Sequence, residues 1–268
     1  MKDKVIVITG GSSGIGKALA EVFGKNGSKI LITGRSQADL DLAVADLKQK
    51  GILVESFKGD VSVVEDNKKM ATEALRLFGR IDVLVNNAGI TMRALFSELD
   101  LSVVKKVMDI NFFGVLYATQ ACLPEIMKNN GSIIGISSIA GFRGLPERTG
   151  YCASKFALNG FLEVLRTEML HQGVHVLTAA PGFTSSNIRK KALTKDGSAQ
   201  GESPSDEEKM MTAAECAQHI YGATVKRKNF LILTAQGKAA VWINKLFPRL
   251  ADKLVYKTMA KEADSPLK

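Results

Sequence analysis

Short apolar segments rich in β-branched residues alternate with longer segments of helical periodicity along the chain. Seven of the short segments are predicted strands: residues 5–8, 29–33, 54–57, 81–85, 132–136, 174–178 and 230–233. Mostly apolar strands separated by helices are typical of a parallel sheet with helices packed on either side. We therefore expect an α/β fold, a doubly wound seven-stranded parallel sheet with helices on both faces.

The predicted domain spans residues 1–236, and its two longest helical segments lie near residues 101–127 and 151–171. A chain of 268 residues can bury a full core without disulfides or a structural metal. Residues 183–210 are polar and weakly periodic, which predicts a flap over a substrate. Residues 237–268 are predicted to form a separate basic, amphipathic tail.

Charge and composition narrow the function classes. The net charge is +9, but residues 226–268 hold ten basic and three acidic side chains, so the rest of the chain is nearly neutral. A neutral body argues against a nucleic-acid partner. The three cysteines (Cys122, Cys152 and Cys216) are too scattered for a disulfide framework, and no zinc-binding motif occurs, so we expect no metal. Without a signal-peptide pattern or a long apolar run, the expected location is cytoplasmic.

A glycine-rich segment, residues 9–16, follows the first predicted strand and leads directly into a helical pattern. Glycine lets the backbone turn tightly and approach a pyrophosphate, whose charge is favoured by the positive end of the following helix. The segment therefore predicts a dinucleotide site; its spacing is G-x-x-x-G-x-G, and the alternative is a plain strand-to-helix turn. The predicted contacts are Gly10, Ser12, Ser13, Gly14, Ile15 and Gly16.

The end of the second strand bears on the choice of cofactor. Arg35 and Ser36 stand where an acidic residue would accept a hydrogen bond from the ribose 2′-hydroxyl of NAD(H). The planar cation of Arg35 instead suits a 2′-phosphate, which favours NADP(H). The alternative is a solvated surface arginine.

Two further strand ends add small or polar residues to the same edge of the sheet. Asp60 and Val61 follow the third strand, where the Asp60 carboxylate either accepts from an adenine amino group or caps the next helix. Asn87, Ala88 and Gly89 follow the fourth strand, whose carboxyl end lies in the cofactor crevice of an open sheet. Turn chemistry alone explains part of this pattern.

The candidate catalytic residues follow the fifth strand. Ser138 ends that strand, and Tyr151 and Lys155 are spaced to share one face of the next helix. Because a neighbouring ammonium favours the phenolate, Lys155 is expected to lower the pKa of Tyr151. Ser138 is expected to hydrogen-bond the same substrate oxygen and to stabilise charge that develops on it.

With these motifs the chain resembles the short-chain dehydrogenase/reductase family, over about residues 3–235, in a single-domain branch with a Rossmann fold. The matching motifs are residues 9–16 and 86–89, Asn111, Ser138, Tyr151-x-x-x-Lys155 and Pro181-Gly182, in family order and spacing. The resemblance implies that Tyr151 donates the proton and that Lys155 holds the cofactor ribose. It also implies that Ser138 polarises the carbonyl and that Asn111 anchors a water relay.

The resemblance implies further cofactor contacts and an assembly. Pro181, Gly182 and Thr184 are expected beside the nicotinamide, although the family often has its threonine slightly later, where this chain has Ser186. Main-chain groups of residues 12–15 are expected to hold the phosphates. Family members form homodimers or homotetramers through the two long helices. Residues 5–34 and 141–146 are similar to reductases of steroids, retinoids and long-chain lipid ketones, including 3-ketodihydrosphingosine reductases.

The tail has apolar residues at three- and four-residue steps with cations between them. The apolar positions are Trp242, Ile243, Leu246, Phe247, Leu250 and Leu254, and the cations are Lys245, Arg249, Lys253 and Lys257. Pro248 either kinks one helix or starts a second. The pattern suits peripheral contact with the inner surface of an anionic membrane, and the alternative is packing on its own domain or on a partner subunit.

The sequence as a whole predicts an NADP(H)-dependent oxidoreductase that interconverts a ketone and a secondary alcohol, with a hydrophobic or lipid-like carbonyl substrate. One alternative is a 3-oxoacyl-[acyl-carrier-protein] reductase that meets its acidic carrier through a basic surface. Another is a nucleotide-sensing protein of the same fold without turnover, because fold alone does not fix function.

Overall fold

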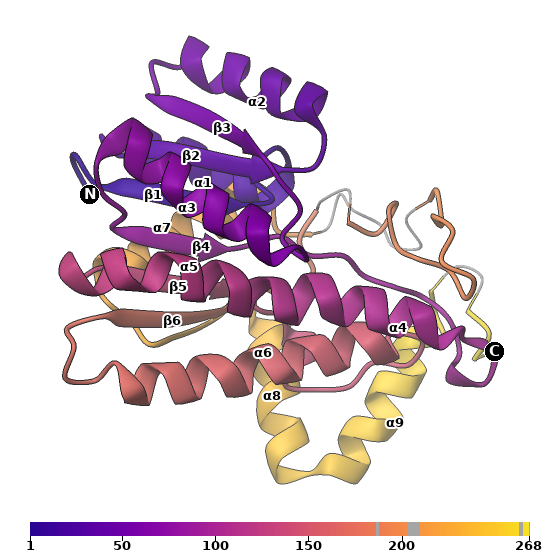
Figure 1. Ribbon diagram of the computed structural model, residues 1–268. Coiled ribbons are helices and arrows are strands. Elements are labelled where there is room, and N and C mark those ends of the chain that lie inside the picture. The colour runs from indigo at the N-terminus through magenta and orange to yellow at the C-terminus, as the bar shows by residue number, and fades with distance from the viewer. Residues whose placement is uncertain (186–187, 203–209, 263–264, 268) are drawn as a thin grey trace.

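The computed structural model describes residues 1–185, 188–202, 210–262 and 265–267. Its centre is a sheet of seven parallel strands in the order β3-β2-β1-β4-β5-β6-β7, which confirms the predicted sheet (Figure 1). The strands are β1 (Val5–Thr9), β2 (Lys29–Gly34), β3 (Val54–Lys58), β4 (Val83–Asn86), β5 (Ser132–Ile136), β6 (His175–Ala180) and β7 (Phe230–Ile232).

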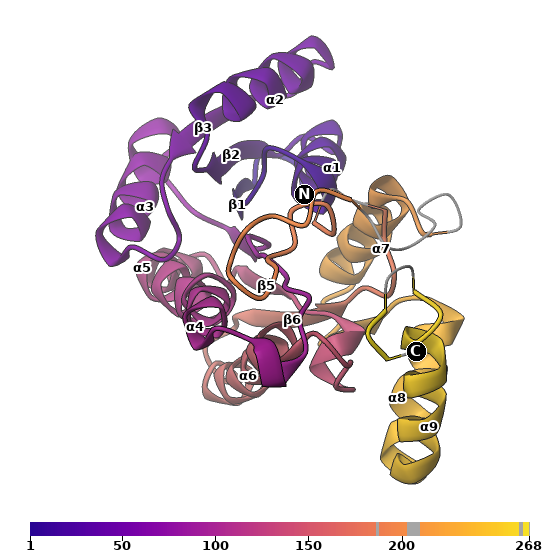
Figure 2. The ribbon, with the colours of Figure 1, turned by 90° about the vertical axis from the view of Figure 1, so that its right-hand side faces the viewer.

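Helices cover both faces of the sheet (Figure 2). One face carries α1 (Gly14–Lys25), α2 (Gln37–Gln49) and α7 (Ala213–Val225), and the other carries α3 (Val64–Phe78), α5 (Gly114–Lys128) and α6 (Thr149–Glu168). The sequence of β1 shows why two cores form: Ile6 and Ile8 pack in the first core and Val7 in the second, because successive side chains point to opposite faces. This arrangement confirms the predicted doubly wound fold.

The order of the strands predicts a crevice at the carboxyl end of β1. This strand lies between β2 and β4, so the chain leaves it toward one side of the sheet and later returns on the other. At such a reversal the loops after the strands diverge, and ligands of open α/β sheets bind there. The loops after β1, β2, β4 and β5 therefore all reach the same edge.

The helical segment predicted near residues 101–127 is interrupted in the structure. Helix α4 (Leu101–Met108) passes into a π-helical turn, η2 (Asp109–Phe113), before α5 begins at Gly114. Asn111 lies in this turn and is fully buried. Apolar periodicity does not reveal such a turn, because the pattern on either side continues at helical spacing.

The tail forms a hairpin of two helices, α8 (Ala235–Leu246) and α9 (Pro248–Met259), which projects from the body of the domain (Figures 1 and 2). Of the two effects predicted for Pro248, the structure shows the start of a second helix. The alternative that the tail packs its apolar residues on its own domain is wrong for most of them. Trp242, Leu246 and Phe247 are 60–61% exposed.

Polar bonds from Arg143 hold this hairpin to the loop after β5. The guanidinium donates to Asn244 Oδ1 in α8 at 2.8 Å and to Asp252 Oδ1 in α9 at 2.5 Å. Asn244 in turn donates to the carbonyl of Phe142 at 2.9 Å. These hydrogen bonds help to position both helices of the hairpin. No helix among the described residues is long and apolar enough to cross a bilayer.

Candidate active site

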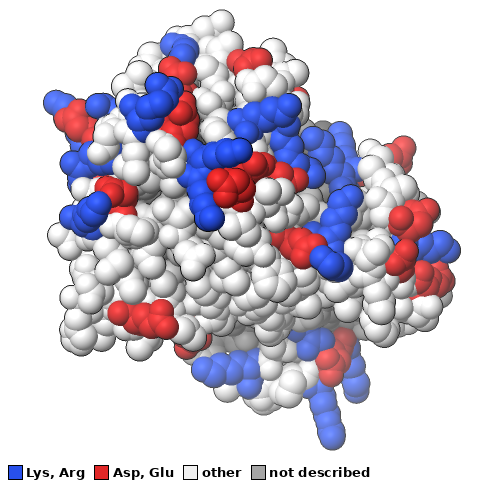
Figure 3. All heavy atoms as spheres, viewed as in Figure 1, with Lys and Arg blue, Asp and Glu red and all other residues white. Residues whose placement is uncertain are grey.

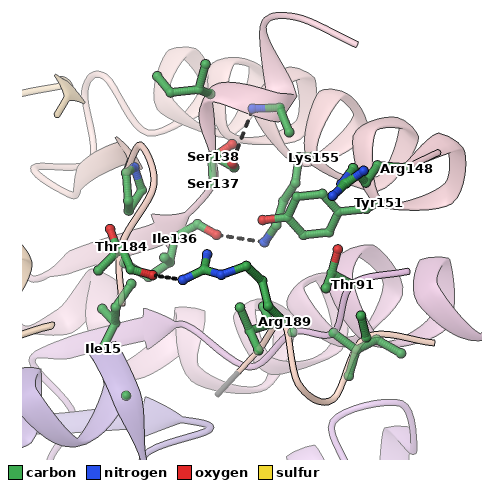
Figure 4. A pocket seen from close by; sticks show the side chains of 18 of the residues that line it. Ile15, Thr91, Ile136, Ser137, Ser138, Arg148, Tyr151, Lys155, Thr184 and Arg189 are labelled. Atoms are coloured by element: carbon green, nitrogen blue, oxygen red, sulfur yellow. Dashed lines mark hydrogen bonds between the residues drawn. The ribbon is translucent and has the colours of Figure 1, made fainter. Parts of the chain in front are cut away.

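A cavity of about 1110 Å³ extends along the carboxyl ends of the strands, from the ends of β1 and β2 to the α8–α9 hairpin. Figure 4 shows its central part, where α6, the end of β5 and the segment after β6 meet. Most of the predicted site residues line it: Gly10, Ser12, Ser13, Gly14, Ile15, Arg35, Ser36, Asp60, Val61, Asn87, Ala88, Gly89, Ser138, Tyr151, Lys155, Pro181, Gly182 and Thr184. Gly16 and Asn111 pack behind lining residues, and Ser186 lies outside the described residues.

The loop after β1 has the shape of a phosphate cradle. Gly10 and Gly14 have φ of +64° and +54°, which glycine adopts without strain. A Cβ atom on Gly16 would lie 2.2 Å from the carbonyl oxygen of Gly10, so the loop requires glycine there. The side chain of Ser13 does not cap α1, and the first turn of α1 has no acidic residue. The N–H groups that begin α1 therefore suit an anion, and the cradle fits the diphosphate of a dinucleotide.

The loop after β4 is bonded to this cradle. The Thr9 hydroxyl accepts from the backbone N–H groups of Asn87 and Ala88, both at 3.0 Å. The Asn87 amide donates to the carbonyls of Thr9 and Gly10, both at 2.9 Å. Asn87 thus does more than form a turn, because it fixes the glycine-rich loop to the neighbouring strand.

The ends of β2 and β3 form the outer part of the cavity. Arg35 is exposed there, and the Ser36 hydroxyl caps α2 by accepting from the Asp39 N–H at 3.2 Å. Asp60 accepts from the Ser62 N–H at 2.9 Å, whereas the residue at the cap of α3 is Val63. The alternative that Asp60 caps the next helix is therefore wrong, since its carboxylate closes a turn that precedes the helix.

Ser138, Tyr151 and Lys155 come together at the centre of the cavity (Figure 4). Tyr151 and Lys155 lie on successive turns of α6, and Ser138 stands just beyond β5, where its hydroxyl accepts from the Ala140 N–H at 3.1 Å. Lys155 is 5% exposed and donates to the carbonyl of Ile136 at 2.8 Å. Its ammonium nitrogen lies 5.8 Å from the centroid of the Tyr151 ring.

Asn111 supports this group from the π-helical turn. Its Oδ1 accepts from the Ile90 N–H at 2.8 Å, and its Nδ2 donates to the Ile90 carbonyl at 2.8 Å and to Ser154 Oγ at 3.0 Å. Ser154 Oγ then donates to the carbonyl of Tyr151 at 2.7 Å. This chain of hydrogen bonds connects η2 to the turn of α6 that carries Tyr151.

Burial has the largest effect on the protonation of Tyr151 and Lys155. It raises the pKa of the Tyr151 phenol, while a hydrogen bond with Ser138 and the charge of Arg189 act in the opposite direction. Burial also lowers the pKa of Lys155 to about 8. Burial therefore opposes the lowering of the Tyr151 pKa that is predicted from Lys155, because desolvation disfavours the phenolate.

The segment after β6 contributes both predicted and unpredicted residues to the cavity. Thr184 is buried, and its hydroxyl donates to the Gly182 carbonyl at 3.2 Å. Arg189 was missed; its guanidinium donates to the Thr184 carbonyl at 2.8 Å and lies within the cavity (Figure 4). Arg93 and Arg148 also line the cavity and were not predicted. Neither periodicity nor a motif distinguishes these arginines from surface cations.

Comparison with known proteins finds relatives that match most of the chain. Residues 4–197 match the family model of short chain dehydrogenase. The chain is 34% identical to "Dehydrogenase/reductase SDR family member 7B" of Rattus norvegicus, over 99% of this chain and 84% of that protein. It is also 34% identical to "11-beta-hydroxysteroid dehydrogenase-like 4A" of Arabidopsis thaliana, over 92% of this chain and 82% of that protein.

Solved structures share the fold. A short chain dehydrogenase/reductase from Burkholderia phymatum, in complex with NAD, superposes with a TM-score of 0.83 at 23% identity, over 93% of this chain and 95% of that one. An alcohol dehydrogenase from Thermococcus sibiricus, complexed with 5-hydroxy-NADP, superposes with a TM-score of 0.76 at 25% identity, over 86% of this chain and 95% of that one.

Proposed function

The chain belongs to the short-chain dehydrogenase/reductase family, and we propose that it is an NADP(H)-dependent enzyme that reduces a hydrophobic, lipid-like ketone to a secondary alcohol. The observation that carries the proposal is the continuous cavity. It joins the glycine-rich loop, the group of Ser138, Tyr151 and Lys155, and a largely apolar wall from the hairpin. The wall is formed by Gly237, Ala239, Ala240, Ile243, Ala251, Leu254, Val255 and Met259, with Gln236 and Thr258 as its polar members.

Each central side chain has a role in the proposed reaction. When bound, the nicotinamide supplies the hydride. Ser138 donates a hydrogen bond to the substrate oxygen and stabilises the charge that develops there. Tyr151 donates the proton, and its raised pKa keeps the phenol protonated at neutral pH, which is the form a reductase needs. The nearby Lys155 ammonium favours the phenolate that remains, and Asn111 keeps this part of α6 in place.

The preference for NADP(H) rests on Arg35. Its guanidinium lies at the outer end of the cavity beside Ser36, where a 2′-phosphate offers a charge partner. The test is a titration of the protein with NADPH and NADH separately, followed by cofactor fluorescence, and repeated with Arg35→Ala. We expect NADPH to bind about tenfold or more tightly, and the variant to remove the difference. Arg76→Ala, which removes an exposed arginine paired with Glu73 in α3, is the control. Equal or tighter binding of NADH would contradict the preference.

The apolar wall favours a lipid-like substrate, and the relative named for 11-beta-hydroxysteroid dehydrogenase agrees with that class. Rates on free long-chain ketones and on carrier-bound 3-oxoacyl chains distinguish this proposal from a carrier-protein reductase. Faster turnover of the carrier-bound chain would favour the alternative. Cofactor binding without turnover of either substrate would favour a nucleotide-sensing protein.

The hairpin supports peripheral membrane contact of a cytoplasmic protein. Its exposed apolar residues, among them Trp242, Leu246 and Phe247, are interspersed with Lys and Arg. Figure 3 shows these cations around the hairpin at the lower edge of the molecule. A surface with apolar and cationic side chains suits an anionic bilayer. Contact of this kind would bring a lipid ketone to the cavity without a passage through water.

A second apolar surface supports a homodimer or homotetramer. Leu101 of α4, Phe113 of η2, and Phe156 and Val164 of α6 are 40–64% exposed. Helix α6 packs against α4 and η2, and Figure 2 shows α4, α5 and α6 together on one side of the sheet. Exposed apolar residues gathered on one surface mark an interaction site. Light scattering of the wild type and of Phe156→Ser would test the assembly, and a monomeric wild type would contradict it.

A further inference from the structure

Four charged side chains meet where the cavity approaches the C-terminal segment. Arg93 Nε lies 2.8 Å from Glu147 Oε2, and Arg148 Nη2 lies 2.6 Å from Glu262 Oε2. Crosswise, Arg93 Nε lies 3.7 Å from Glu262 Oε2 and Arg148 Nη1 lies 3.9 Å from Glu147 Oε2. We call these four residues the Glu147 cluster. Their side chains are only 2–12% exposed, so the charges depend on one another for compensation.

Three distant parts of the chain build this cluster. Arg93 follows β4, Glu147 and Arg148 precede α6, and Glu262 follows α9. Glu147 has φ of +65°, a strained conformation for a residue with a side chain. Its carbonyl accepts from the Ala94 N–H at 2.9 Å, and its Oε1 accepts from Ser265 Oγ at 3.3 Å. The cluster therefore fastens the C-terminal segment to the loops beside the active site.

Three members of the cluster, Arg93, Arg148 and Glu262, line the cavity, as do Thr258 and Met259 of the last turn of α9. Arg35 and the end of β2 line it as well, but Figure 2 shows α2 and β2 on the opposite side of β5 from α9 and the C-terminal end. Arg148 stands three residues before Tyr151, and the two side chains lie beside each other in the cavity (Figure 4). The cluster is thus placed at the end of the cavity remote from the cofactor cradle.

We infer that Glu262 is the end wall of the substrate cavity and that it makes the enzyme select uncharged chain ends of limited length. This inference rests on the proposed function, because it specifies which ketones the same cavity accepts. Among the described residues of the cluster two guanidinium groups face two carboxylates, so each cation already has a carboxylate partner. A substrate chain that ends in a carboxylate adds an anion beside Glu262 to cations that are already paired, whereas an apolar chain end meets Met259 and the hydrocarbon part of Glu262.

Two variants of Glu262 separate charge from size. Glu262→Gln keeps the volume of the side chain but leaves a guanidinium of the cluster without its carboxylate, so a carboxylate on the substrate gains a partner. Glu262→Ala gives the same charge and also opens space beyond Met259. Glu168→Gln, an exposed position at the end of α6, is the matched control that removes one negative charge elsewhere.

The experiment uses linear methyl ketones of graded chain length, each paired with the ketone of equal length that ends in a carboxylate. For every pair we measure kcat/KM with the preferred reduced cofactor and, by calorimetry, binding to the complex with the oxidised cofactor, in which no reduction occurs. Both Glu262 variants are expected to raise the ratio of carboxylate-ended to neutral ketone about tenfold or more, because one charged hydrogen bond is gained. Only Glu262→Ala is expected to shift the optimum toward longer chains.

The outcomes separate the inference from the proposed reaction. In one outcome the wild type and both variants all reduce ketones, with the same ratio of carboxylate-ended to neutral ketone and the same optimum chain length. That result would overturn the role of Glu262 as end wall and leave the proposed reaction intact. If the ketones bind with the expected charge and length preferences but are not reduced, the role of Glu262 as end wall is supported and the proposed reaction is overturned. If no ketone binds to the wild type, both are overturned. A rise of the ratio in Glu168→Gln as well would assign the effect to net charge and overturn the wall.

Discussion

The ammonium of Lys155 lies 5.8 Å from the centroid of the Tyr151 ring, one helical turn away in α6. At this position the ammonium is buried and donates to a backbone carbonyl, so it is fixed beside the phenol. A fixed cation next to a partly buried phenol has little effect on the neutral side chain and a large effect on the phenolate. The pair therefore suits a proton donor that becomes charged only during the reaction.

Tyr151→Phe is expected to lower kcat for ketone reduction by a factor of about 10² to 10⁴, since the variant lacks the donated proton. Binding of the cofactor is expected to change little, because the ring that lines the cavity remains. Initial rates and cofactor fluorescence measure the two effects. Tyr221→Phe is the control, since this tyrosine packs edge-on against Phe23 in the core. Wild-type turnover in Tyr151→Phe would rule out the assigned role.

The raised pKa of Tyr151 predicts opposite pH profiles for the two directions of the reaction. Ketone reduction needs the protonated phenol and should stay high from neutral to mildly alkaline pH. Alcohol oxidation needs the phenolate and should rise with pH across the same interval. The profiles of kcat/KM for a ketone and its alcohol, measured in one buffer series, test this. Parallel profiles in both directions would exclude Tyr151 as the titrating group.

Lys155 is predicted to reduce stability near neutral pH. Its pKa is lowered from 10.5 to about 8, so above pH 8 the unfolded chain binds more protons at this residue than the folded chain does. The stability contribution of Lys155 therefore rises between about pH 8 and pH 10.5, by an amount on the order of 3 kcal/mol. Lys155→Met should be more stable than the wild type at pH 7, and the difference should shrink toward pH 10.5. Urea denaturation of both proteins measures it, and a pH-independent difference would contradict the prediction.

Two glycine-to-alanine changes test the cradle. In Gly16→Ala the new Cβ atom would lie 2.2 Å from the Gly10 carbonyl oxygen, which should cost about 2 kcal/mol of stability and most of the cofactor affinity. In Gly222→Ala, within α7, nothing lies within 4 Å of the new Cβ atom. Helix propensity should then stabilise this variant by about 0.5 to 1 kcal/mol without effect on cofactor binding. Denaturation and cofactor titration should separate the two variants, and equal behaviour would count against the cradle.

The exposed hairpin predicts binding to anionic vesicles. Sedimentation with vesicles of phosphatidylglycerol and phosphatidylcholine should recover the wild type, and replacement of Leu246, Phe247 and Leu250 by serine should lower recovery severalfold. Replacement of Lys245 and Arg249 by glutamine should weaken the salt-sensitive part of binding. Equal recovery of all proteins, or recovery of none, would contradict membrane contact by the hairpin.

The sequence predicted the sheet and the central site because both depend on local patterns. Apolar strands, glycines after β1 and the spacing of Tyr151 and Lys155 are visible within short windows, and parallel strands bring their ends to one edge. The Glu147 cluster was not predicted, because Glu147 and Glu262 are brought together only by the path of the tail. The effect of burial, which raises the pKa of Tyr151, was not predicted, because a sequence does not show which side chains are enclosed.

The hydrogen bonds from Arg143 to both helices of the hairpin have a consequence for hydrogen exchange. Helices α8 and α9 bury only Gly237, Ala251 and Met259, so little buried apolar surface becomes exposed to water when the two helices detach from the domain. The amides of α9 should therefore exchange with deuterium through local opening, long before those of β4 and β5. In Arg143→Ala that opening should become more frequent. The hairpin residues that form the apolar wall would then move away from the cavity while the sheet stays folded.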